Sequence, residues 1–193
     1  MTTLNLTGEL ERLIRDIVAR TPELQHIAPE RLLVCVSSGR ASRGGSLAKI
    51  HPLRFEGGER SVKARRGRRS VLCTMPSITH RGEEMLYVIY FLVPRFLELP
   101  FREKLITIFH ELYHISPACD GDIRRFPGRN YAHGSSTRSY NLFMGQLVDR
   151  YLEATPDRSG LAFLEGDLAA LRSRHSAIVG RRLQAPRISV SPA

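Results

Sequence analysis

Two histidines and a glutamate near the middle of the chain have the types and spacing of a metal-dependent hydrolase. His110 and His114 are four residues apart, just over one helical turn, so both imidazoles project from one helix face and can bind one zinc ion. Glu111 lies beside that face, where its carboxylate can take a proton from a zinc-activated water as the water attacks a carbonyl carbon. The pattern predicts zinc-dependent peptide hydrolysis, with His110 and His114 as ligands and Glu111 as general base.

A catalytic zinc ion usually has three protein ligands and one open position, so a third donor is expected downstream. We favour His133, because Gly121 and Gly128 in the preceding loop allow the chain to turn back beneath the metal. Carboxylates on that loop and on the following helix are rival ligands, although turn capping or solvated helix charge is the simpler explanation for them. These rivals are Asp120, Asp122, Asp149 and Glu153.

The oxyanion that forms during such an attack needs a hydrogen-bond donor. Tyr131 lies two residues before His133, so its phenol can reach that oxygen and is our candidate for this role. Arg124 and Arg125 are alternatives, and they can instead pair with the aspartates of the same loop.

The motif is expected on a helix over residues 100–116. Leu105, Phe109 and Leu112 fall on the face opposite the two histidines, so this helix has a core side and a ligand side. Apolar spacing predicts further helices over residues 8–20, 138–154 and 161–171. Strand-forming residues predict strands over 31–37, 47–55, 70–75 and 85–93, and the stretch 60–69 is expected to be an exposed hairpin tip or a disordered loop.

The length suits one domain over residues 1–175, with a basic segment at 56–70 inserted into it. Residues 176–193 are basic, contain two prolines near their end and have little to bury, so we expect a disordered tail.

Positive charge is concentrated in two parts of a chain whose formal net charge is +10. Residues 38–70 contain ten basic residues but only two acids, Glu56 and Glu59, and residues 171–193 contain five arginines and no acid. Arginine pairs well with phosphate, so these segments are candidates for non-specific, salt-dependent binding of nucleic acid. The alternative function is a nucleic-acid-associated zinc protein, or a SprT-like protease that acts on DNA-bound proteins. A solvated charged surface explains the same residues equally well.

Several features bear on the compartment and the partners. Cys35, Cys73 and Cys119 are far apart and form no CxxC pair, which favours isolated thiols over a disulfide framework. The longest apolar run, residues 85–93, is about half the length of a membrane-spanning helix, so no membrane partner is expected. The first residues do not resemble a secretory signal. We therefore expect a cytoplasmic enzyme that acts on a protein or peptide.

Three strings around the motif resemble the phage metallopeptidase family: HELYHISP at 110–117, DGDIRRF at 120–126 and YAHG at 131–134. The serine- and arginine-bearing segment at 37–50 is similar to that family as well, so the resemblance covers about residues 32–134. It implies an α+β fold, namely a compact zincin-like domain with a small mixed β-sheet, an active-site helix and C-terminal helices. It also implies His133 as the third ligand.

The same resemblance implies that the strand at 86–93 borders the substrate cleft, with a free edge to which an extended peptide adds. The arginine-rich insertion at 62–70 and the basic tail depart from the simplest family pattern. A phage connection also suggests cleavage of cell-wall peptides during lysis, against which the missing export signal argues.

Overall fold

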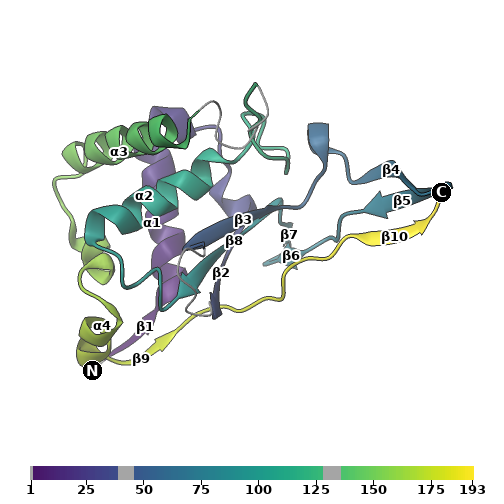
Figure 1. The fold of residues 1–193 in the computed structure, drawn as a ribbon. Coiled ribbons are helices and arrows are strands. Elements are labelled where there is room, and N and C mark those ends of the chain that lie inside the picture. Colours follow the sequence, from purple (N-terminus) through teal and green to yellow (C-terminus); the bar gives the residue numbers. More distant parts are fainter. Residues whose placement is uncertain (1, 39–45, 128–135) are drawn as a thin grey trace.

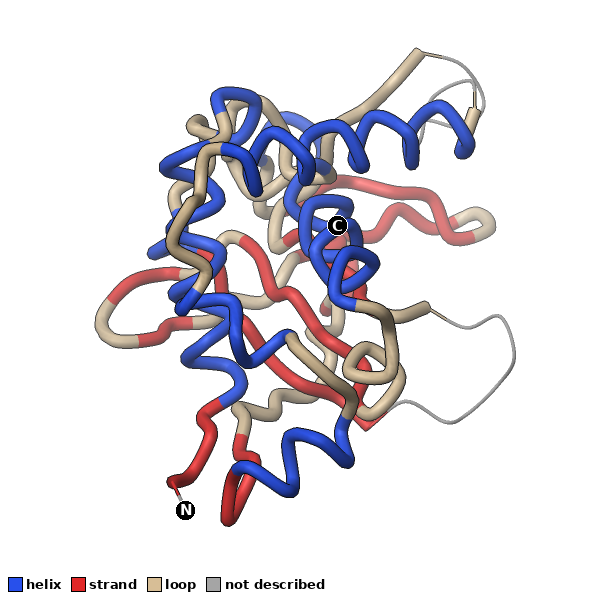
Figure 2. The backbone as a smooth tube through the Cα atoms, turned by 90° about the vertical axis from the view of Figure 1, so that its left-hand side faces the viewer, coloured by secondary structure: helices blue, strands red, loops and turns tan. Residues whose placement is uncertain are grey.

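A three-stranded mixed sheet lies at the centre of the molecule (Figure 1). The computed structural model describes residues 2–38, 46–127 and 136–193. The sheet has the order β2 (Leu32–Ser38), β8 (Tyr87–Val93) and β3 (Ala48–Pro52), and β8 runs parallel to β2 and antiparallel to β3. Helices and small sheets together make this an α+β protein, as the sequence predicts (Figure 2).

The central position of β8 corrects one expectation. The resemblance placed residues 86–93 at a free edge, whereas β8 has a hydrogen-bonded partner on each side, and β2 and β3 are the edge strands. The physical reason is composition: β8 is almost wholly apolar and is buried along Tyr87–Phe91. A strand buried on both faces is best placed in the interior of a sheet, where its backbone groups are paired on both sides.

Three long helices pack on one face of the sheet and form the main core with it. They are α1 (Leu6–Arg20), α2 (Phe101–Tyr113) and α3 (Thr137–Glu153). The apolar residues whose spacing predicts the first helix are all buried, which confirms its amphipathic pattern: Leu10, Leu13, Ile14, Ile17 and Val18. Asn5 caps this helix by accepting a hydrogen bond from the backbone N–H of Gly8. The other face of the sheet has a smaller cluster around Cys35, Val88 and Tyr90.

The last predicted helix is divided in two. A 3-10 helix covers Ser159–Leu164 and α4 covers Leu168–Arg174, with Gly166 between them at a φ of 78°. That left-handed conformation suits glycine and interrupts the helical path. Lys104 of α2 is fully buried below this break, and its Nζ donates to the carbonyl oxygens of Leu164 and Gly166 at 2.9 and 2.5 Å. The buried ammonium therefore ties α2 to the C-terminal elements.

A second three-stranded sheet extends away from the helices as an arm (Figure 1). Its order is β10 (Ser189–Pro192), β5 (Arg69–Thr74) and β4 (Ser61–Arg66), all antiparallel. The basic segment is thus an ordered hairpin and not a disordered loop.

The disordered tail expected at 176–193 is also corrected, because β10 pairs with β5 and β9 (His175–Val179) pairs in parallel with β1 (Thr2–Asn5). The composition of a segment indicates how much apolar surface it can bury by itself. It does not show whether distant parts of the chain pair with the backbone of that segment and order it.

The remaining elements are short. They are the strands β6 (Thr79–His80) and β7 (Glu83–Glu84), and the 3-10 turns Pro22–Leu24, Pro29–Arg31 and Glu56–Gly58. Among the described helices, none is both long enough and apolar enough to cross a membrane.

Candidate active site

Helix α2 brings the two motif imidazoles together. Its core side is formed by the three predicted residues, Leu105, Phe109 and Leu112, which are completely buried. On the other side the rings of His110 and His114 have centroids 4.8 Å apart, with 75° between their planes. His114 is the C-terminal cap of the helix and still has helical backbone angles. The structure therefore places both candidate ligands on one side of one helix end.

Glu111 is buried between α2 and the edge strand. Burial raises the pKa of its carboxyl to about 7, and a hydrogen bond with the backbone of Ile50 opposes that rise. The hydrogen-bond pattern between β3 and β8 explains why the backbone of Ile50 is available to Glu111. Leu92 N–H bonds to Leu47 O and Leu53 N–H bonds to Leu86 O, so the antiparallel alternation directs the backbone groups of Ala48 and Ile50 away from β8. Glu111 thus contacts the free edge of β3, which pairs with no other strand of the described residues.

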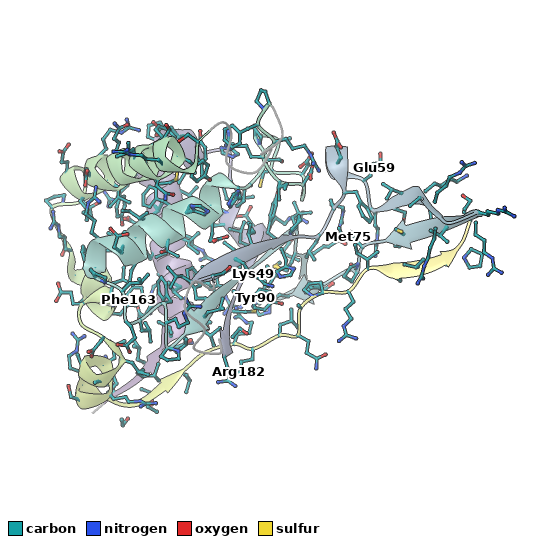
Figure 3. All side chains as sticks on the ribbon, viewed as in Figure 1. Lys49, Glu59, Met75, Tyr90, Phe163 and Arg182 are labelled. Atoms are coloured by element: carbon teal, nitrogen blue, oxygen red, sulfur yellow. The ribbon has the colours of Figure 1, made fainter. Side chains whose placement is uncertain are left out.

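A cleft of about 690 Å³ opens beside these residues. Leu47 and Ala48 lie on its strand side, and His110 and Glu111 lie on its helix side. Leu142 of α3, which is well exposed, contributes an apolar surface to the same cleft. The cleft therefore combines the edge of β3, the imidazole of His110 and the buried carboxyl of Glu111. A second cavity of about 720 Å³, lined by Tyr90 and Arg182 among others, contains none of the three motif residues (Figure 3).

Tyr140 of α3 is a site residue that the sequence did not reveal as one, since its helical spacing indicated only a core position. Its buried ring packs against the imidazoles of His110 and His114, with centroids 4.9 and 5.8 Å away. Its hydroxyl donates to the backbone oxygen of His110 at 3.4 Å, and burial raises its pKa. Tyr140 is therefore in a position to fix the orientation of both rings.

The loop after the motif turns back along the helix end. The backbone N–H of Arg124 donates to His114 O at 2.6 Å, and Ile115 and Ile123 form an isolated antiparallel bridge. Tyr87 fixes the turn, because its hydroxyl accepts a hydrogen bond from Gly121 N–H and donates to Asp122 O, at 2.9 and 2.8 Å. The described part of the loop returns toward the imidazoles, as the glycine-containing sequence predicts.

Three of the four rival ligands, Asp120, Asp122 and Asp149, have structural partners instead. Asp120 accepts from the Ser116 hydroxyl and from the Asp122 N–H, and Asp122 pairs with Arg125. On α3, Asp149 pairs with Arg102. Arg124 lies over the ring of Tyr113, with its guanidinium carbon 4.2 Å from the centroid. Turn formation and ion pairing therefore account for these charges.

His133 and Tyr131 lie outside the described residues. Within the part of the chain that is described, no group of three His, Cys, Asp or Glu side chains is arranged to hold a metal ion. The two adjacent imidazoles and the neighbouring carboxyl nevertheless fit a divalent transition metal, because neutral imidazole nitrogens are good zinc ligands. The described residues thus bring together two side chains that could bind such a metal.

Comparison with known proteins identifies a family but gives no individual relative. Neither a search of curated proteins nor a search of solved structures gives a match. One protein-family model does match, over residues 4–135, which is more than half of the chain and includes β2, β3, β8 and the whole of α2. It extends further toward the N-terminus than the resemblance noted from the motifs, and it ends just before α3. The chain belongs to the family that this model describes as "Putative phage metallopeptidase".

Proposed function

We propose that the chain is a zinc-dependent peptidase of the HExxH type, with His110, His114 and His133 as the metal ligands and Glu111 as the general base. One observation carries the proposal: the buried carboxyl of Glu111 and the imidazole of His110, whose ring is 4.8 Å from that of His114, line a cleft whose other wall is the edge of β3. When bound, zinc would polarise the scissile carbonyl and acidify a water. Glu111 would accept the proton from the attacking water and deliver it to the leaving amine.

The edge strand β3 gives the substrate a place to bind. The backbone N–H and C=O of Ala48 face away from β8 and border the cleft. An extended peptide can add to such an edge by main-chain hydrogen bonds. These bonds would place one of its amides in the cleft between β3 and α2. The exposed Leu142 side chain would contact an apolar side chain of that peptide. β3 therefore takes the role that the sequence had assigned to residues 86–93.

Both flanks of the segment that contains His133 are close to the imidazoles, which supports its proposed role. On one side Arg124 bonds to His114 O. On the other, Tyr140 contacts both rings and lies one helical turn after Ser136, the N-cap of α3. His133 is three residues before Ser136, a span of at most about 10 Å of extended chain. Tyr131 is proposed to donate to the oxyanion, since it comes two residues earlier.

The decisive experiment compares Glu111→Gln with Glu103→Gln. Glu103 is in the first turn of the same helix and lines the same cleft, so it is a matched control for charge and location. Glu111→Gln should bind one zinc ion per chain, measured by elemental analysis, while its kcat on a protein substrate falls by roughly 10²- to 10⁴-fold. Glu103→Gln should retain both properties. Undiminished proteolysis by Glu111→Gln would refute Glu111 as the base.

Two further variants distinguish the role of a metal ligand from the role of the oxyanion donor. His133→Ala should lower zinc occupancy together with activity, whereas Tyr131→Phe should keep full occupancy and lose roughly 10²-fold in kcat. Refilling the metal-free protein with zinc, cobalt or manganese identifies the metal that supports turnover. Full zinc occupancy in His133→Ala would show that another residue is the third ligand.

A further inference from the structure

The arm has an excess of positive charge that the described structure leaves uncompensated. Its hairpin contains five exposed cations and no acid between Arg60 and Met75: Lys63, Arg65, Arg66, Arg68 and Arg69. None of these five forms an ion pair with a carboxylate of the described residues. Glu59 and Met75 lie at the base of the arm, away from its tip (Figure 3).

The register of the hairpin distributes these charges around the tip. Lys63 and Arg65 are alternate residues of β4 and share one face, whereas Arg66 lies directly opposite Arg69 and both face the other way. Arg68 belongs to the tight turn between the strands, next to Gly67. The tip therefore presents cations on both faces and at its end. A partner with a flat surface would contact the cations of one face only.

The tip is also narrow. β10 pairs with Val71–Thr74 of β5 and the Ala193 N–H bonds to Ser70 O, so beyond Ser70 and its partner Arg65 the described arm has two strands only. A two-stranded ribbon is narrow enough to enter the major groove of duplex DNA, which is about 12 Å wide. In that groove, phosphates would lie on both sides of the ribbon, just as the cations lie on both faces of the tip.

The composition of the arm distinguishes between anionic partners. Four of the five cations are arginines, whose guanidinium groups bind phosphate oxygens through two parallel hydrogen bonds. Residues 60–75 contain no aromatic side chain on which unpaired bases could stack, which disfavours single strands. They also contain no Asn or Gln to read adenine edges. The partner that fits is a duplex bound through its backbone.

We propose that the β4–β5 hairpin of the arm binds duplex nucleic acid, without regard to base sequence, by placing its arginine-rich tip in a groove. The five cations neutralise phosphates on both sides of that groove and release counterions. The C-terminal strand β10 supports the base of the hairpin through its pairing with β5. Arg174 at the end of α4 and Arg181 after it contribute little, since they already bond to Glu165 O and to the Glu11 carboxylate.

The test uses the full chain and a duplex of about 25 base pairs of arbitrary sequence, with fluorescence anisotropy measured at several salt concentrations. Arg65→Gln, Arg66→Gln and Arg68→Gln are combined in the arm variant. The control combines Arg15→Gln, Arg158→Gln and Arg172→Gln, which are also exposed and remove the same charge from the body. The arm variant should lose roughly 100-fold in affinity near 0.1 M salt, and its salt slope should fall by about 0.9 for each lost contact.

Two results would overturn the proposal. Equal losses in the arm variant and the control would show that only net charge matters, and competition by polyglutamate as strong as by duplex would assign the arm to acidic polypeptides. Thermal unfolding of both variants checks that they fold, as expected for exposed side chains. The proposal is independent of the peptidase function: the arm variant should cleave a short peptide normally, and Glu111→Gln should bind duplex normally.

Discussion

The ring of Tyr140 stacks on the imidazole of His114, with 5.8 Å between the centroids and 23° between the planes. The same ring meets His110 nearly at a right angle. A single side chain from α3 therefore limits the rotation of both candidate ligands, as groups around a metal site do when they orient its ligands.

Removing this ring should weaken metal binding. We expect Tyr140→Ala to lower zinc affinity by roughly 10- to 100-fold, because the imidazoles lose the surface that orients them. The same change should destabilise the protein by about 3–5 kcal/mol through the cavity that it leaves. Competition with a chelator and thermal unfolding measure the two effects. Tyr140→Phe keeps the ring and should retain nearly all the affinity; a comparable loss in Tyr140→Phe would assign the role to the hydroxyl.

The free edge of β3 predicts a periodic effect of backbone methylation in the substrate. An N-methyl group on an amide that pairs with Ala48 removes one hydrogen bond, and should raise KM roughly fivefold. Methylation of the next amide should have little effect, because alternate amides of an extended strand point in opposite directions. A set of singly N-methylated versions of one cleaved peptide tests this. Uniform KM values along the set would count against strand addition.

Lys104 should contribute to stability through the two carbonyl groups that it satisfies. Lys104→Met has a similar length but leaves Leu164 O and Gly166 O without this donor, so we expect a loss of about 1–3 kcal/mol in the free energy of unfolding. Denaturant titration measures the loss. Arg172→Met, at an exposed position of α4, is the control and should change stability by less than about 0.5 kcal/mol.

Buried tyrosines should make the fold sensitive to alkali. Burial raises the pKa of Tyr87 and of Tyr90 to about 12, above the value of about 10 in an unfolded chain. Because the pKa is higher in the folded state, the contribution of each tyrosine to the free energy of unfolding is complete below about pH 10. This contribution is lost as the pH rises toward 12, by about 2–3 kcal/mol for each group. Unfolding free energies measured from pH 8 to 12 should show this decline.

Tyr87→Phe separates that effect from general alkaline damage. It should be less stable than the wild type at pH 8 by about 1–3 kcal/mol, since Gly121 N–H and Asp122 O lose their partner. It should also decline less steeply above pH 10 than the wild type. An identical decline in both proteins would show that Tyr87 does not titrate in this range.

The elements that the sequence predicts well are those whose pattern is local. Helix α2 has an apolar face and a proline before its first residue, so its position follows from residues within a few turns. The strands β9 and β10 were missed because their partners, β1 and β5, are more than a hundred residues away in sequence. The hairpin at β4–β5 was ambiguous because arginine is uninformative about strand formation.

The candidate site divides in the same way. The pair His110 and His114 follows from helical spacing alone, and the structure brings the two rings together. The contact of Tyr140 with them depends on how α3 packs against α2, which no local pattern reports. The edge position of β3 likewise depends on the order of the strands. The roles of His133 and Tyr131 remain predictions.

The region that carries the family signature ends before α3, and much of what supports it comes later in the chain. Residues 136–193 supply the ring that orients the imidazoles, the carbonyls that hold Lys104 and the third strand of the arm. A fragment cut at residue 135 would keep the motif and His133 but lose this support, and the apolar side of α2 that faces Met144 and Leu147 would be open to water. The matched region is thus not expected to fold stably when it is separated from residues 136–193. Any relative that shares it must have its own means of covering the same helix.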